Sequence, residues 1–232
     1  MTPATTPRRP TSTGPTGTGP TSTGPTSTGP TARTRPVPVG LRAQFRETLR
    51  ERVLETASAA ATEQGWGQVR MADLARRAGV SRSAIHREFG DKEAVAHALV
   101  AHESDRVIAE VGQALIDAPD WRAGIAAALR TTMAARENHP LIHAVLTGEH
   151  DDVTLLPQLT TGSTAIIARA RVMLSTWLRG HHPRLPRPML DDAADVLVRA
   201  ALSHLTAPEA DRELAVARLQ RLAVRLMVAQ RV

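Results

Sequence analysis

Residues 71–95 are MADLARRAGVSRSAIHREFGDKEAV. The pattern predicts a short helix over Met71–Ala78, which ends at Gly79 because glycine permits the tight backbone of a turn. Ser81 is a favourable N-cap for a second helix through Phe89, since its hydroxyl can accept from a free N–H of the first helical turn. Two short helices joined by such a turn predict a helix-turn-helix, a motif that places its second helix in the major groove of DNA.

The predicted second helix has an apolar side and a polar side. Val80, Ile85 and Phe89 share one side, on which they can pack against Leu74 and an upstream helix. The residues that this leaves pointing outward are Arg82, Ser83, His86 and Arg87. Arg can bind guanine through two hydrogen bonds, Ser can bond a base or a phosphate, and free N–H groups at the helix start, at Ser81, favour phosphate. We therefore expect this side to contact DNA.

This stretch resembles the N-terminal signature of the TetR family of transcriptional regulators. The resemblance covers about residues 45–95 and is carried by Leu74-Ala75, Ala78-Gly79-Val80-Ser81, Ile85-His86-Arg87-Glu88-Phe89 and Lys92-Glu93. It implies base contacts for Arg82 and Ser83, and a phosphate contact for Lys92 at the start of the fourth helix. Lys92 is the single Lys among 29 basic residues, and the alternative is an exposed residue of a first helical turn, where a cation gains nothing from the helix dipole.

Two residues depart from the family pattern. His86 stands where the family usually has Tyr; it either contacts a phosphate, with a pH-dependent charge, or is an ordinary exposed histidine. Arg70 stands where the family usually has a Thr that caps the second helix, so the cap is lost and a cation is directed toward the expected DNA backbone. These differences concern the details of contact, and the motif itself is retained.

The net charge of +6 is concentrated toward the start of the chain. Residues 1–40 hold four Arg and no acidic residue, residues 41–90 hold nine Arg against six acidic residues, and residues 91–232 are close to neutral. This asymmetry is typical of a polyanion-binding end joined to a neutral body, although an Arg-rich solvated surface would have the same charge. Within residues 1–40, a TSTGP-like unit repeats four times without a large apolar residue, which predicts a disordered tail.

The remaining composition predicts an all-α fold of about nine helices. Aromatic residues make up 2% of the chain, and Ala, Leu and Arg favour helices. Leu49, Val53, Ala57 and Ala61 form one apolar face of a first helix that begins near Gly40. We expect a three-helix DNA-binding domain at 41–90 and a larger helical domain for ligand binding and dimerisation at 91–232. Helix breakers divide the latter into helices at 91–117, 121–138, 141–147, 156–179, 189–206 and 209–230, with a loop at 148–154.

The larger domain is expected to enclose an apolar cavity. Its sparse polar residues favour a small apolar or amphipathic ligand, and the residues expected to face the ligand are Trp121, Met133, His143, Met173 and Trp177. The alternative for each is an ordinary core position, which is the more frequent role of Met or Trp at helical spacing. His139, His143 and His150, like His181 and His182, lack a clear carboxylate-completed ligand pattern, so we expect no metal, and no cofactor is indicated. The chain contains no Cys, nucleophile elbow, P-loop or GxGxxG motif, so we expect no enzyme.

The last two predicted helices carry broad apolar surfaces that favour a homodimer. They are formed by Ala193, Ala194, Val196, Leu197, Ala200, Ala201 and Leu205, and by Leu214, Ala217, Leu222, Val224 and Leu226. Two such helices from each subunit would form a four-helix bundle, unless these surfaces pack only within the subunit. A two-fold dimer would place two reading helices about one DNA turn, or a multiple of it, apart and would bind a palindromic double-stranded operator.

The sequence as a whole predicts a ligand-responsive transcriptional repressor. Ligand binding would favour a geometry in which the two reading helices no longer match the spacing of the operator half-sites. A ligand-responsive activator would have the same sequence features. Two other classes remain: an architectural DNA-binding protein without a ligand, and a helical enzyme or scaffold whose helix-turn-helix is only structural. No apolar stretch approaches the length of a membrane span and no signal peptide is evident, so we expect a cytoplasmic, nucleoid-associated protein.

Overall fold

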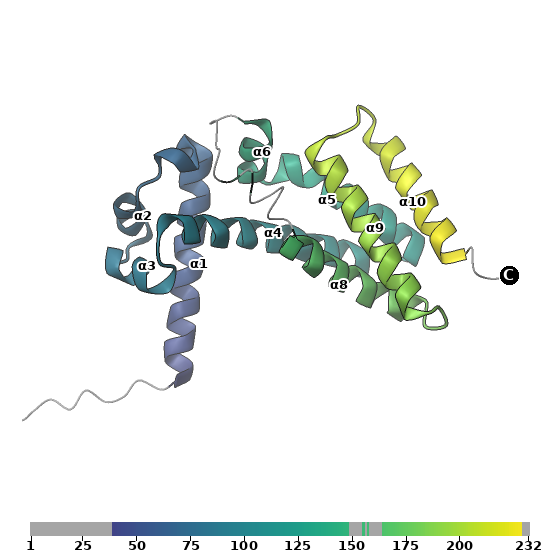
Figure 1. Cartoon of the computed structure of the whole chain (residues 1–232), viewed down its shortest axis with the longest axis horizontal. Coiled ribbons are helices and arrows are strands. Elements are labelled where there is room, and N and C mark those ends of the chain that lie inside the picture. The colour runs from purple at the N-terminus through teal and green to yellow at the C-terminus, as the bar shows by residue number, and fades with distance from the viewer. Residues whose placement is uncertain (1–38, 149–154, 156, 158–163, 229–232) are drawn as a thin grey trace, which may run out of the picture. The chain divides into compact units, whose positions relative to one another are not determined.

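The computed structural model describes residues 39–148, 155, 157 and 164–228, and these residues contain nine α-helices and one 3-10 turn (Figure 1). The DNA-binding part contains α1 (Val39–Gln64), η1 (Trp66–Gln68), α2 (Met71–Ala78) and α3 (Arg82–Glu88). The rest contains α4 (Lys92–Ile116), α5 (Trp121–Asn138), α6 (Pro140–Thr147), α8 (Thr164–His181), α9 (Arg187–Thr206) and α10 (Arg212–Val228). The all-α prediction is confirmed; the tail predicted over residues 1–40 lies almost entirely outside the described residues.

The turn and the helix caps predicted for the helix-turn-helix are present. Gly79 adopts a left-handed backbone with φ 67°, and its N–H bonds the carbonyls of Ala75 and Arg76 to close α2. The hydroxyl of Ser81 accepts from the N–H of Ala84 at 3.1 Å, and a carboxylate oxygen of Asp91 accepts from the N–H of Ala94 at 2.8 Å. These side chains satisfy N–H groups that a helix start leaves without an intrahelical partner.

Two helix boundaries differ from the prediction for local reasons. Helix α9 begins at Arg187, before Pro188, because proline is tolerated in the first turn of a helix where no N–H is needed. Helix α10 begins at Arg212 instead of Glu209, because Asp211 accepts from the N–H of Leu214 at 3.0 Å and so serves as the cap. The predicted start of α8 at residue 156 falls in a segment that is described only at residues 155 and 157.

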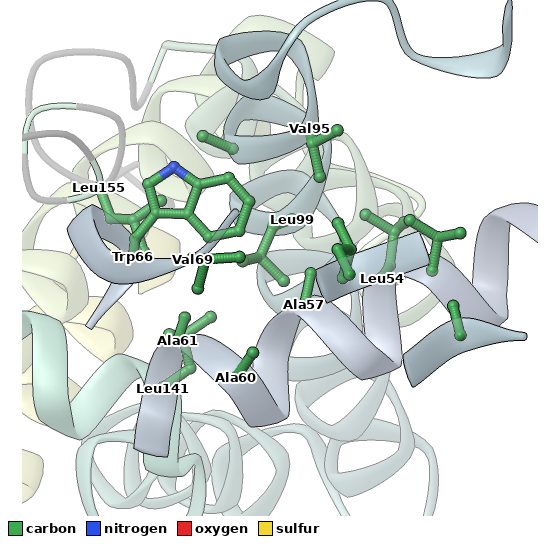
Figure 2. Close-up of a cluster of buried hydrophobic side chains, with 14 of the residues drawn as sticks. Leu54, Ala57, Ala60, Ala61, Trp66, Val69, Val95, Leu99, Leu141 and Leu155 are labelled. Carbon is green, nitrogen blue, oxygen red and sulfur yellow. The ribbon is translucent and has the colours of Figure 1, made fainter. Parts of the chain in front are cut away.

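The first apolar cluster seals the helix-turn-helix against α1 and α4. Leu49, Val53, Ala57 and Ala61 are buried, which confirms the apolar face of the first helix. Trp66, 1% exposed, lies against this face and near Leu155 (Figure 2). Leu141 and Val145 of α6 belong to the same cluster, so the DNA-binding part and the following helices share a core. The described residues accordingly belong to one compact unit.

The second apolar cluster joins α5, α8, α9 and α10. Its buried members include Leu129, Leu178, Leu190 and Val216. Several residues expected at a dimer surface are buried here inside their own subunit: Ala193, Ala194, Leu197 and Ala201. The expected dimer surface is therefore only partly available, since these side chains of α9 face the interior of their own subunit.

Candidate nucleic-acid interface and effector cavity

The buried side of α3 fixes which residues it exposes. Ile85 is fully buried, while Val80 and Phe89 are half-buried against the first cluster. Arg50 of α1 adds a second hold on the helix end, with its guanidinium carbon 4.9 Å from the Phe89 ring centre and its Nη1 3.8 Å from a Glu88 oxygen. The position of α3 relative to α1 is thus set by packing and by a cation above an aromatic ring.

The opposite side of α3 carries the predicted DNA-contacting residues. Arg82, Ser83, His86 and Arg87 are all exposed, as are Ser81 and Arg70. The hydroxyls of Ser81 and Ser83 lie 3.0 Å apart, and Ser81 is already engaged as the cap of the helix. Arg70 occupies the N-cap position of α2 with no side-chain capping bond, as its side chain cannot accept a hydrogen bond. This side is a polar, cationic surface on a short helix.

Lys92 has a structural contact that sequence reasoning did not anticipate. Its Nζ donates to the carbonyl oxygen of Gly67 at 3.0 Å and lies 5.4 Å from the centre of the Trp66 ring. The start of α4 is thereby held to the turn between α1 and α2. An ammonium group has three N–H donors, so the bond to Gly67 leaves the predicted phosphate contact chemically feasible.

An apolar cavity of about 120 Å³ lies within the larger helical part. Its wall combines side chains of α4, α5, α6, α8 and α9, including Val107, Ile108, Leu129, Ile142, Ile167, Met173, Val198 and Leu202. The hydroxyl-bearing residues of this wall are Ser104, Thr132 and Thr206, and no charged residue is among the described lining residues. Such a cavity favours uncharged, largely apolar molecules.

Only one of the five predicted ligand-facing residues lies on the cavity wall. That residue is Met173, while Trp177 lines an adjacent surface groove. Met133 is buried in the second cluster, and the ring of Trp121 packs edge-on against His182 with ring centres 4.7 Å apart. The Nδ1 of His143 lies 3.2 Å from the backbone oxygen of Arg136. Sequence reasoning missed the wall residues of α4 and α9 because their apolar spacing does not distinguish a cavity wall from a filled core.

A buried polar junction connects the DNA-binding part to the cavity. Glu103 of α4, 3% exposed, accepts from the hydroxyl of Ser58 of α1 at 2.7 Å. Its other oxygen lies 3.8 Å from Nδ1 of the buried His139, whose Nε2 is 3.0 Å from a Glu110 oxygen. The neighbour of Glu103, Ser104, lines the cavity. Hydrogen bonds at this junction therefore join α4 to α1 through Glu103 and Ser58, and join α4 to the α5–α6 turn through Glu110 and His139.

Among the described residues, no group of three or more His, Asp or Glu side chains is placed to hold a metal ion. The Nε2 of His139 lies 3.0 Å from a carboxylate oxygen of Glu110. The Nδ1 of His181 lies 3.0 Å from the backbone oxygen of Trp177. His150 lies outside the described residues. No helix in the described part of the chain has the length and apolar character needed to cross a membrane.

Comparison with known proteins agrees with this geometry. Residues 53–99 match the family of bacterial regulatory proteins of the tetR type, and residues 120–225 match the C-terminal domain family of the bacterial tetracyclin repressor. The HTH-type transcriptional regulator AlkX of Mycobacterium tuberculosis is 30% identical over 181 residues, covering 73% of this chain and 81% of the relative. The chain belongs to the TetR family. It is therefore a DNA-binding transcriptional regulator of a non-enzymatic family, whose members bind operator DNA and small-molecule effectors.

Solved structures show the same fold at lower identity. The TetR family repressor AlkX of Dietzia sp., implicated in the biodegradation of n-alkanes, is 23% identical with a TM-score of 0.62, covering 76% of this chain and 94% of that one. RolR, solved in complex with resorcinol, is 21% identical with a TM-score of 0.55, covering 82% of this TetR-family chain and 97% of that one.

Proposed function

We propose that this regulator is a repressor that binds a palindromic operator as a dimer and is released by a small apolar or amphipathic effector. The observation that carries the proposal is the two-sided character of α3. Ile85 anchors the helix in a sealed core, and Arg82, Ser83, His86 and Arg87 are exposed on its other side. A rigid helix with exposed Arg and Ser near its start suits base contacts in the major groove.

The roles of the exposed residues follow from their chemistry. Arg82 and Ser83 contact base edges, because they are in the first turn of α3. Arg87, His86 and Arg70 contact backbone phosphates on either side, together with the N–H groups near Ser81. Lys92 adds a phosphate contact through its positive charge at the start of α4. Because the partner is chromosomal DNA, the protein acts in the cytoplasm at the nucleoid.

Exposed apolar residues on the last two helices support the dimer. Val196 of α9 is 44% exposed, and Leu214 and Leu222 of α10 are 42% and 36% exposed. Large apolar side chains exposed on neighbouring helices are typical of a subunit interface. A two-fold interface there produces two copies of α3 and hence a palindromic operator with half-sites at helical-turn spacing.

Helix α6 offers a direct route from effector to operator. Its Leu141 and Val145 pack in the cluster that holds α1, while Ile142 and Leu146 line the cavity. A ligand that displaces α6 therefore disturbs the packing beneath the DNA-binding helices, and the junction at Glu103 couples α4 to the same movement. Operator affinity then falls by the same factor by which the ligand binds the displaced state more tightly than the DNA-binding state. In typical allosteric proteins this factor is about 5- to 150-fold.

Selection of bound fragments from a random DNA library tests the proposal. The wild-type dimer should enrich a palindrome, and Arg82→Ala/Arg87→Ala should lose it. The matched control is Arg221→Ala/Arg225→Ala, which removes two exposed Arg from α10 and should enrich the same palindrome. Enrichment of no motif by the wild-type protein would contradict the proposal, and residual salt-sensitive binding would then indicate an architectural protein.

A further inference from the structure

A second concave surface lies between α4 and α8, next to the cavity. This groove is open and apolar, with Ile116 of α4 and Val172 of α8 on its rim and Trp177 on its wall. Ile116 and Val172 are 70% and 61% exposed, which are high values for large apolar side chains. Exposed apolar residues gathered in a concave surface indicate a place where a ligand or partner binds.

A single side chain lies between the groove and the cavity. Met173 belongs to the walls of both. On the α4 side it faces Gly112, where an added Cβ would lie 4.0 Å from both Cγ and Sδ of Met173. Methionine is unbranched with three rotatable bonds, and glycine presents no side chain against it. Rotation of one flexible side chain is therefore enough to join the two spaces.

The size of the cavity indicates how much of a ligand it can hold. A volume of about 120 Å³ is slightly smaller than the roughly 150 Å³ cavity that accepts benzene in a well-studied protein. A chain longer than about six carbon atoms exceeds this volume, and the groove beyond Met173 is an adjacent apolar space for the remainder. Arg169, the charged residue on the described groove wall, has its Nε 2.7 Å from Asp105 Oδ1, so its charge is compensated within the protein. The combined space consequently favours an uncharged, elongated apolar chain.

We propose that the effector carries a linear alkyl chain that passes Met173, with one end in the cavity and the remainder in the groove between α4 and α8. This inference rests on the proposed effector-controlled function and adds the class and path of the effector. The groove supplies an apolar surface for the part of the chain that the cavity excludes. The polar end of the molecule lies toward solvent, next to the Arg169–Asp105 pair.

A chain-length series tests the path. Dissociation constants of n-alkan-1-ols from butanol to decanol are measured by calorimetry with the full-length protein. Affinity should rise roughly fourfold per methylene, the value for burying a CH₂ group, and should continue beyond about six carbons. In Gly112→Leu, the new side chain fills the space beside Met173, so the rise should stop near six carbons. Gly180→Leu is the matched control on α8, where an added side chain meets nothing within 4 Å, and it should behave as the wild type.

The results that would contradict the alkyl path differ from those that would contradict the proposed regulator function. A rise that stops at the same length in the wild type and in Gly112→Leu would overturn the proposed path, whether or not the protein selects an operator. Failure to select an operator, with the length dependence intact, would contradict the regulator function and leave the alkyl path standing. Both variants are checked for native helix content by circular dichroism.

A second copy of the chain is the other occupant that could cover the groove. Val172→Glu places a charge on the groove rim and distinguishes the two occupants. Under the proposal, decanol binding should weaken at least tenfold, butanol binding should stay within twofold, and the sedimentation coefficient should not change. Conversion of a dimer to a monomer by Val172→Glu would show that a second subunit covers the groove, and the proposal would then be wrong.

Discussion

Two apolar regions of this regulator are filled differently. Around α1, the first cluster closes on Trp66, which is 1% exposed, and on fully buried residues such as Val53 and Ala57. Between α4 and α9, similar aliphatic residues leave about 120 Å³ unfilled. A DNA-reading helix must keep a fixed position, whereas an effector site must leave room. The same residue types therefore serve both purposes, and the difference lies in how completely their side chains fill the space between the helices.

The largest expected effect of this difference is at the buried tryptophan. Trp66→Ala empties the centre of the sealed cluster and should lower the free energy of unfolding by about 3–5 kcal/mol. Trp121→Ala is the matched control, because Trp121 is only half-buried at the start of α5 and should cost much less. Urea unfolding followed by circular dichroism measures both values. Equal losses would contradict the distinction between a sealed cluster and a looser one.

Replacing a buried alanine by leucine should affect stability differently in the two regions. Ala57→Leu inserts extra carbon atoms where no space exists and should destabilise the protein by about 1–3 kcal/mol. Ala201→Leu adds the same atoms at the cavity wall, where they can occupy empty space, and should leave stability unchanged or raise it. The pair is compared by thermal and urea unfolding. A similar loss for both would indicate that the cavity is not a real space in solution.

Lys92 tests whether the DNA-binding part uses one residue for two purposes. Lys92→Met should weaken binding to all DNA sequences alike and reduce the slope of log affinity against log salt by about 0.9, the value of one phosphate contact. It should also lower stability through loss of the bond to Gly67. Arg225→Ala, a change of an exposed cation on α10, should leave the salt slope unchanged. An unchanged slope in Lys92→Met would show that the residue is structural only.

The smallest effect concerns an exposed ion pair in the C-terminal helices. The hydrogen bonds from Arg130, at 2.9–3.0 Å, lower the pKa of Glu213 from its usual value of 4.5. Because the folded-state pKa is depressed, the stabilisation is present above pH 4.5 and is lost as the pH falls through the folded value. Glu213→Gln should therefore reduce stability slightly at pH 7 and not at pH 2, since solvent screens the pair. An equal loss at both pH values would rule out this origin.

Sequence reasoning was strongest where one residue determines local geometry. Gly79, Ser81 and Asp91 are recognisable because a left-handed turn or a helix cap demands particular residue types. The outward side of α3 followed from the helical period once Ile85 was placed inside. Proline in the first turn of α9 was harder to place, because Pro188 can either precede a helix or lie in its first turn.

The cavity could not be located in the same way. Its wall draws residues from five helices that are far apart in the sequence, and nothing in their spacing separates a wall from a filled core. Trp121 and Met133 were expected to face the ligand, and both instead take the alternative role of packing against other side chains of the protein. The contact of Lys92 with Gly67 depends on the position of η1, which no local pattern specifies.

The most direct test of the central claim, that α3 reads DNA bases while the sealed cluster holds it in place, is a base-by-base affinity profile. Wild type and Arg82→Ala are titrated against every single-base variant of the selected half-site. The account predicts that Arg82→Ala loses about 1–3 kcal/mol of discrimination at one symmetric position and keeps the wild-type preferences elsewhere. Uniform weakening at every position, with no loss of discrimination at any of them, would show that Arg82 contacts only the backbone and would contradict the account.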